Sequence, residues 1–241
     1  IALANQVVPY LLRRSQRRTI GLSIDHRGLV VAAPLRATLA NIEAMLRNHG
    51  DWVLTKLDKW HAHCPEPLRI ANGTTLPYLG GTLNLRVASG TGRSRSVWHS
   101  DDSRALLTLF PLPGGSTESL LTRALQARAR EVFAARLRHY AALLEIVPPP
   151  LSLSSARTRW GSCSRNAAAA PGAPNTYAIR LNWRLILMPL PIIDYVVAHE
   201  LAHTREMNHS PRFWAVVDTL YPDWRQARQE LRRLAATLPT W

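Results

Sequence analysis

Residues 191–205 read PIIDYVVAHELAHTR, and this stretch carries more information about fold and chemistry than any other part of the chain. Pro191 is typical of a helix start, and the almost wholly apolar run after it predicts a buried helix. His199 and His203 are four residues apart, so both imidazoles lie on one helix face, as two ligands of one zinc ion require. Glu200 follows the first imidazole and can reach a metal-activated water from the side.

Chance is a poor explanation for this pattern. With the histidine and glutamate content of the chain, it arises by chance on the order of 0.01 times per chain. Two imidazoles and a carboxylate in an apolar helix also need hydrogen-bond partners or a metal ion. We therefore interpret His199, Glu200 and His203 as parts of a metal site.

A catalytic zinc site typically has three protein ligands and one open position. The candidates for the third ligand are Glu206, His209, Asp218, Asp223 and Glu230. On an unbroken helix, His209 would point about 240° away from His203. Asn208 tolerates the left-handed conformation that ends helices, and Ser210-Pro211 is typical of the N-cap and first residue of a new helix. We therefore expect His209 on a turn between two helices as the third ligand, with Glu206 as its rival.

Such a site predicts a zinc-dependent peptidase with one Zn²⁺ per chain. Zinc makes water acidic near neutral pH, and Glu200 takes the proton as the water attacks a carbonyl and then passes it to the leaving amine. A second donor to the oxyanion stays open among Tyr195, Tyr221 and Arg159.

The N-terminal half reads as strands with one helix. Residues 19–25 and 29–33 predict a β-hairpin, residues 38–60 a helix, and residues 74–79 and 82–87 a second hairpin. Residues 89–96 read as a loop and residues 105–110 as a strand. The segment PLPGG at 111–115 predicts a boundary, which gives a β-rich region at 1–112 and a metallopeptidase domain at 113–241.

The C-terminal half begins with a long helix. Ser116 is the expected N-cap of a helix running to about residue 146, and a strand is expected at 151–158. Residues 179–185 alternate apolar and polar side chains, which predicts another strand. Whether it is an internal strand or an edge that aligns an extended peptide stays open.

Four residues near these strands are candidate substrate contacts, with structural roles as the alternatives: Arg180, Asn182, Arg159 and Trp160. Cys163 is more typical of a small buried side chain than of a metal ligand. His61, His63 and Cys64 could bind metal weakly, but their place before a proline favours an exposed loop.

The composition limits the classes of protein. The 46% hydrophobic content suits a folded core, and no apolar run is long enough to span a membrane. Two cysteines exclude a disulfide-dense scaffold, so we expect a soluble protein of a reducing compartment, the cytoplasm. The net charge of +14 suits either a solvated surface or a nucleic-acid partner, although no nucleic-acid recognition motif accompanies it.

Four segments together resemble the YgjP-like (DUF45) metal-dependent hydrolases: RWGSCS at 159–164, LNWRL at 181–185, IDYVVAHELAH at 193–203 and NHSPRFW at 208–214. These hydrolases look like zincin metallopeptidases related to the SprT and WSS1 proteases. The resemblance is dense over about residues 150–225. It implies an α+β fold with a zincin-like C-terminal domain, in which helices pack on a small mixed sheet, preceded by a hairpin-rich region.

The resemblance also implies roles for individual residues. It makes His199, His203 and His209 the zinc ligands, Glu200 the catalytic residue, and a peptide or protein the substrate. The stretch 166–175 is longer than the turn usual in that family and could cover or widen the cleft. Two alternatives stay open: a protease or other module associated with DNA or RNA, and a metal-binding fold without turnover.

Overall fold

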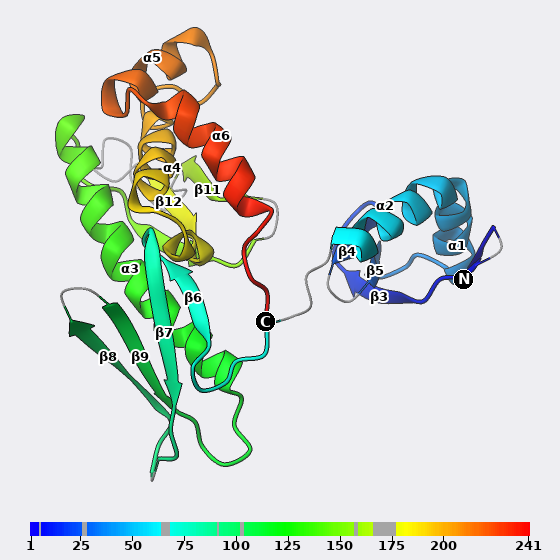
Figure 1. Ribbon diagram of the computed structural model, residues 1–241. Coiled ribbons are helices and arrows are strands. Elements are labelled where there is room, and N and C mark those ends of the chain that lie inside the picture. Colours follow the sequence, from blue (N-terminus) through cyan, green and yellow to red (C-terminus); the bar gives the residue numbers. More distant parts are fainter. Residues whose placement is uncertain are drawn as a thin grey trace. The chain divides into compact units, whose positions relative to one another are not determined.

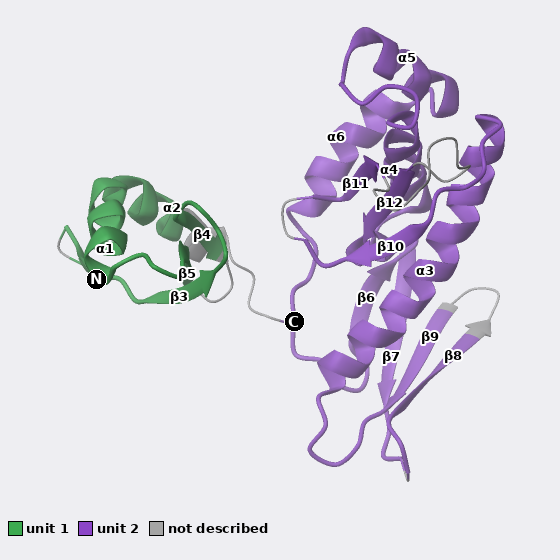
Figure 2. Ribbon diagram, turned by 180° about the vertical axis from the view of Figure 1, so that it is seen from behind, with its two compact units in different colours: residues 1–66 green, residues 67–241 purple. Residues whose placement is uncertain are grey.

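The computed structural model describes residues 1–241 except 5, 26–27, 64–67, 91, 102–103, 157–158 and 166–176. The chain forms two compact units, residues 1–66 and residues 67–241 (Figure 2). The side chains of His61 and His63, together with Cys64 and the long stretch at 166–175, lie outside the described part of the structure. The α+β fold class is confirmed, because helices and small mixed sheets occur in both units.

Unit 1 consists of a three-stranded sheet, a short β-ribbon and two helices. Its elements are β1 (Ala2–Leu3), β2 (Gln6–Val7), β3 (Tyr10–Ser15), β4 (Gly21–Asp25), β5 (Gly28–Pro34), α1 (Leu39–Asn48) and α2 (Gly50–His63). The strand order is β3-β5-β4, with β4 and β5 forming the expected antiparallel hairpin. Val31 in β5 and Ile42 and Leu46 in α1 are fully buried in the core of this unit.

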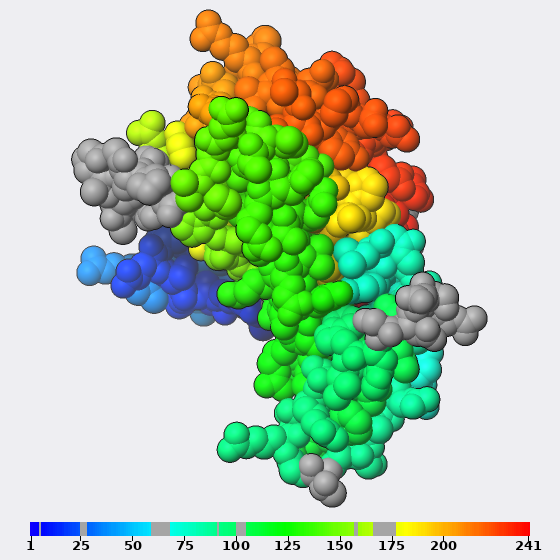
Figure 3. All heavy atoms as spheres, turned by 90° about the vertical axis from the view of Figure 1, so that its left-hand side faces the viewer, coloured from blue at the N-terminus to red at the C-terminus, as the bar shows by residue number. Residues whose placement is uncertain are grey.

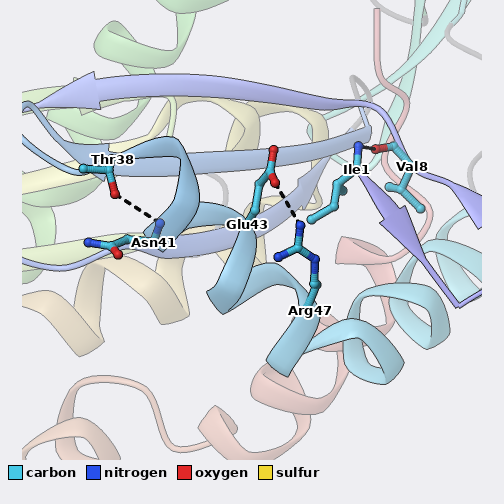
Figure 4. A network of polar contacts seen from close by, with 6 residues as sticks. All are labelled: Ile1, Val8, Thr38, Asn41, Glu43 and Arg47. Atoms are coloured by element: carbon cyan, nitrogen blue, oxygen red, sulfur yellow. Dashed lines mark hydrogen bonds and ion pairs between the residues drawn. The ribbon is translucent and has the colours of Figure 1, made fainter.

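Hydrogen bonds join the two ends of the segment 1–8 and cap the start of α1 (Figure 4). The N-terminal ammonium of Ile1 donates to the Val8 carbonyl at 3.0 Å, and the Thr38 hydroxyl accepts from the Asn41 N–H at 3.2 Å. Thr38 is therefore the N-cap of α1.

The single helix expected at 38–60 is wrong, because the chain forms two helices that meet at His49. His49 is the C-cap of α1, with a backbone outside the helical region, and its Nδ1 lies 2.9 Å from the Met45 carbonyl. The sequence Asn48-His49-Gly50 has low helix propensity, so a break there costs little.

Unit 2 contains the long helix, two sheets and the histidine-bearing helix. Its elements are β6 (Thr75–Tyr78), β7 (Gly81–Val87), β8 (Arg95–Asp101), β9 (Arg104–Phe110), α3 (Thr117–Leu143), β10 (Leu151–Ser154), β11 (Gly161–Arg165), β12 (Tyr177–Asn182), the 3₁₀ helix η1 (Trp183–Leu187), α4 (Leu190–Ala202), α5 (Pro211–Leu220) and α6 (Trp224–Ala235). The sheet orders are β6-β7-β9-β8 and β10-β12-β11.

Helix α3 joins the two halves of unit 2. Ser116 caps it as expected, because its hydroxyl accepts from the Ser119 N–H at 3.0 Å. Figure 3 shows α3 crossing one face of the unit, from the strands β7–β9 toward α5. Leu121, Phe133 and Ala141 along α3 are fully buried in one core that includes residues from β7, β9 and α4.

This shared core explains where the chain divides. The sheet of β6–β9 packs into the same hydrophobic cluster as α3 and α4, so the compact units separate between residues 66 and 67. The expected boundary at 112/113 instead falls within unit 2, at a turn where the Gly115 N–H donates to the Leu112 carbonyl. Proline and glycine at 111–115 mark that turn correctly but do not mark a unit boundary.

The segment 179–185 differs from the expected strand. Strand β12 ends at Asn182, whose side-chain oxygen accepts from the Arg184 N–H and starts η1. Strand β12 also lies between β10 and β11, so it is not an edge. The hypothesis that it pairs with an extended peptide is therefore wrong, because both of its edges are already paired.

Two further differences concern strand ends. Strand β8 begins at Arg95, inside the stretch expected to be a loop, because its residues pair with β9 over the full length of both strands. Strand β10 ends at Ser154 rather than continuing to residue 158. Among the helices that the structure describes, none is both long and apolar enough to cross a membrane.

Candidate metal centre

Helix α4 lies in the interior of unit 2, between α3 and α6 and beside the sheet of β10–β12 (Figure 1). The helix positions His199 and His203 one turn apart, with imidazole centroids 5.2 Å from each other. Because most residues of α4 are buried against neighbouring elements, the helix has little freedom to shift or rotate. The two imidazoles are therefore presented on a rigid support.

The chain turns sharply after α4, as expected from the sequence. The last carbonyls of the helix accept from Thr204 and Glu206, with the Glu206 N–H at 3.0 Å from the Ala202 carbonyl. Ser210 then caps α5, because its hydroxyl accepts from the Phe213 N–H at 3.4 Å. His209 lies directly before this cap, on the turn between the two helices.

Three imidazoles converge at this turn. His199, His203 and His209 each offer a ligand nitrogen, and these nitrogens all lie within 4.8 Å of one another. The Nε2 atoms of His199 and His209 are 3.1 Å apart. Nitrogens bound tetrahedrally to one zinc ion at about 2.0–2.1 Å would be about 3.3 Å apart, so this spacing fits a shared metal ion.

A backbone contact orients the second imidazole. The Nδ1 atom of His203 lies 3.2 Å from the Glu206 carbonyl, so Nδ1 carries the proton and Nε2 has a free lone pair. The carboxylate of Glu206, the rival third ligand, instead accepts from the Asn208 N–H at 3.4 Å. Glu206 thus holds the turn through both its carbonyl and its carboxylate and is not among the three converging groups.

The electrostatic environment favours the neutral form of His199 and His203. Burial, followed by the nearby His203, His209 and Arg228, lowers the pKa of His199 to about 3. Burial also lowers the pKa of His203. Metal ions bind the unprotonated ring, so these two imidazoles are ready for a metal ion at neutral pH. The buried Nδ1 atom of His199 has no hydrogen-bond partner within the described part of the chain.

Two aromatic residues of α5, for which no role was predicted from the sequence, support the exposed third imidazole. The Phe213 ring is fully buried and lies within 4.9 Å of each of the three imidazole centroids. The Trp214 ring stacks against His209 at 5.8 Å and against Trp224 at 4.1 Å. The signals in the sequence were their place in the NHSPRFW segment and in the first turn of the helix that follows His209.

Glu200 points away from solvent toward β11. It is 6% exposed, and the backbone N–H of Cys163 donates a hydrogen bond to its carboxylate. Burial raises the pKa of Glu200 to about 7, and the Cys163 hydrogen bond opposes part of this shift. A carboxyl group with a pKa near neutrality can both accept and release a proton under physiological conditions.

This buried carboxyl group predicts a pH-dependent effect on stability in protein stripped of metal. Its pKa rises from an ordinary 4.5 to about 7 on folding, so its stabilising contribution is complete below pH 4.5 and is lost as the pH rises through 7. The Glu200→Gln variant avoids the buried charge. We expect it to be more stable than the metal-free wild type by up to about 3 kcal/mol at pH 8, and by less than about 1 kcal/mol at pH 5.

Urea denaturation of both metal-free proteins at the two pH values measures this difference. An equal free-energy difference at pH 5 and pH 8 would show that Glu200 does not carry a raised pKa.

The other predicted site residues differ in their surroundings. Tyr195 is buried, with its ring 6.0 Å from His199 and 6.5 Å from Tyr221, whereas Tyr221 is half-buried at the end of α5. Burial raises the pKa of both phenols, which keeps them protonated and able to donate. Arg159 is exposed just before β11.

The candidate substrate contacts also differ in burial and in hydrogen-bond partners. Asn182 is 3% exposed, and its amide nitrogen donates to the Ala156 and Arg159 carbonyls at 2.6 and 3.1 Å. Its polar atoms therefore hold the segment before β11. Trp160 is half-buried against the core, and Arg180 is exposed with its Nε 3.3 Å from the Ser152 hydroxyl.

The thiol of Cys163 is not part of the metal-ligating group. It is half-buried, and burial, followed by the charge of Glu200, raises its pKa to about 12. A thiol with so high a pKa stays protonated at neutral pH and is a poor metal ligand.

Comparison with known proteins identifies the class. A family model described as the YgjP-like metallopeptidase domain matches residues 18–234, a range that includes β11, α4 and the turn with His209. The protein is therefore a metal-dependent peptidase. Because the match extends over most of the sequence, the chain belongs to the YgjP-like metallopeptidase family.

Among solved structures, the chain is similar to the metallopeptidase zymogen abylysin of Pyrococcus abyssi, with 16% identity and a TM-score of 0.34. The similarity covers 45% of this chain and 99% of that chain. No curated protein matches the chain.

Proposed function

We propose that the protein is a zinc-dependent metallopeptidase that hydrolyses peptide bonds, with Glu200 as the general base. The observation that carries this proposal is the convergence of three imidazole nitrogens within 4.8 Å, with a buried carboxyl group on the residue next to His199. His199, His203 and His209 are the proposed ligands of one zinc ion. Three imidazoles suit zinc well, since zinc accepts nitrogen ligands in a tetrahedral arrangement.

The proposed roles follow from the surroundings of each group. Zinc bound to the three imidazoles supplies Lewis acidity, which makes water acidic near neutral pH and polarises a carbonyl group. Glu200 takes the proton from the attacking water and delivers it to the leaving amine, a task that suits a carboxyl group with a pKa of about 7. Tyr195 and Tyr221 are proposed donors to the oxyanion because both phenols are protonated and Tyr195 lies beside His199.

The proposed substrate is a peptide or protein. His209 is exposed while His199 and His203 are partly buried, so the centre is open to solvent from the side of the turn before α5. Arg159 is exposed beside β11 and remains a proposed substrate contact. A cytoplasmic location and a relation to the SprT and WSS1 proteases also remain predictions. The nucleic-acid hypothesis rests on the net charge of +14 and on the resemblance to the SprT and WSS1 proteases, and it gains no support from the family match.

Removal and return of the metal ion test this function. We expect a zinc chelator to abolish hydrolysis of unfolded casein, and one equivalent of Zn²⁺ per chain to restore it. Circular dichroism of the chelated protein is the control, since loss of fold would also abolish activity. Undiminished hydrolysis by protein with no measurable metal would contradict the proposal. Stoichiometric zinc without cleavage of any unfolded protein would instead favour a metal-binding fold without turnover.

A further inference from the structure

The side chain of Glu200 lies against the backbone of β11 with no room between them. An ideal Cβ atom added to Gly161, the first residue of β11, would lie 2.4 Å from Oε1 of Glu200. The same Cβ would lie 2.6 Å from Cγ and 2.7 Å from Cδ of Glu200. Atoms this close repel strongly, so a side chain at residue 161 is incompatible with the present position of the carboxylate.

The backbone conformation at residue 161 does not require a glycine. Gly161 is not among the glycines with positive φ, and it pairs with Leu181 in the regular antiparallel register of β11 and β12. Other residue types adopt such a backbone readily. A glycine inside a strand often marks the close approach of another group, and here that group is Glu200.

A second contact from the same strand holds the same carboxylate. The backbone N–H of Cys163, two residues after Gly161, donates a hydrogen bond to Glu200. Strand β11 therefore confines the Glu200 side chain through van der Waals contact at one residue and binds its carboxylate at another. The strand is itself fixed by its register with β12 from Gly161 to Arg165.

We infer that Gly161 is a positioning residue for Glu200: its missing side chain lets β11 hold the carboxylate in the place from which it transfers protons. This inference rests on the proposed function, because it assigns Gly161 a role through the proposed base. Rates of proton transfer depend on the position of the base to within a fraction of an ångström. A methyl group at residue 161 forces either Glu200 into another rotamer or β11 away from α4, and both changes weaken the Cys163 contact.

The test compares Gly161→Ala with Gly81→Ala in the zinc-loaded protein. Gly81 also lies in a strand with an ordinary φ, but its added Cβ would have only the Tyr78 carbonyl nearby, at 3.7 Å. We expect Gly161→Ala to lower kcat by about 100-fold with KM and zinc content unchanged, as for a displaced catalytic group. Gly81→Ala should keep the wild-type kcat. A wild-type kcat for Gly161→Ala would overturn the inference.

A stability cycle keeps the inference testable if Gly161→Ala fails to fold. Truncation of Glu200 removes the atoms that the new methyl group would meet. We therefore expect Gly161→Ala to lower the Tm in the wild-type background but to leave it unchanged in the Glu200→Ala background. An equal loss of Tm in both backgrounds would overturn the inference, because the methyl group would then collide with something other than Glu200.

The two proposals fail in different ways. Full activity of Glu200→Gln would overturn the proposed function, because no base would then need positioning. Full activity of Gly161→Ala beside an inactive Glu200→Gln would overturn only the positioning role.

Discussion

Replacing Glu200 with glutamine is expected to lower kcat by about 1,000-fold while one zinc ion per chain stays bound. Glutamine has nearly the same shape as glutamate, so it fits the space beside Gly161 and leaves α4 unchanged. It cannot accept a proton, however, and the attacking water then lacks its base. The measurement is the rate of hydrolysis of a fluorogenic peptide, with zinc quantified by atomic absorption in the same samples.

A matched control separates this effect from a general loss of charge. Glu131→Gln changes an exposed carboxylate on α3 that pairs with Arg128, so it should keep the wild-type rate. If Glu200→Gln retained the wild-type rate with zinc bound, Glu200 would not be the base. If it lost zinc together with activity, the carboxylate would be needed for metal binding rather than for proton transfer.

Replacing His209 with alanine is expected to weaken zinc binding by more than about 100-fold. Loss of a residue that only orients a ligand costs 10- to 100-fold in affinity, and loss of a ligand itself should cost more. His199 and His203 would remain, but the metal-ligating group found among the described residues would lose one of its three nitrogens. Competition with a chromophoric zinc chelator measures the dissociation constant of each variant.

Two other variants show whether this loss is specific. His139→Ala removes an exposed imidazole of α3 and should keep the wild-type affinity. Glu206→Gln removes the carboxylate of the rival ligand but keeps the backbone carbonyl that accepts from His203, so it should also bind zinc normally. Loss of zinc from Glu206→Gln with retention by His209→Ala would reverse the assignment of the third ligand.

Local sequence signals predicted the placement of the three histidines at the end of α4 and on the turn after it. The spacing of His199 and His203 fixed their common face on α4, and Ser210 with Pro211 marked the start of α5. Because these signals are local, they placed His209 on the turn without knowledge of the rest of the fold. The N-cap at Ser116 and both hairpins followed from the same kind of signal.

Features that depend on distant parts of the chain could not be predicted. The alternating pattern at 179–185 continues past Asn182, but the side chain of Asn182 ends the strand by hydrogen bonds with Ala156, Arg159 and Arg184. The central place of β12 depends on its pairing with β10 and β11, which the pattern does not encode. Likewise, the shared core of β6–β9 with α3 moves the unit boundary away from the turn at 111–115.

The contact of Gly161 with Glu200 can be understood only from a local sequence signal and the packing of distant segments together. A glycine in the RWGSCS segment indicates that something approaches the backbone closely, but the sequence does not say what approaches. The packing of β11 against α4 identifies that group as the proposed base.

Zinc K-edge X-ray absorption of the purified protein tests the central claim most directly. We predict one zinc ion per chain with three imidazole nitrogens at about 2.0–2.1 Å and no sulfur ligand. A sulfur shell at about 2.3 Å, or fewer than three imidazoles around the metal, would contradict the assignment of His199, His203 and His209 as its ligands.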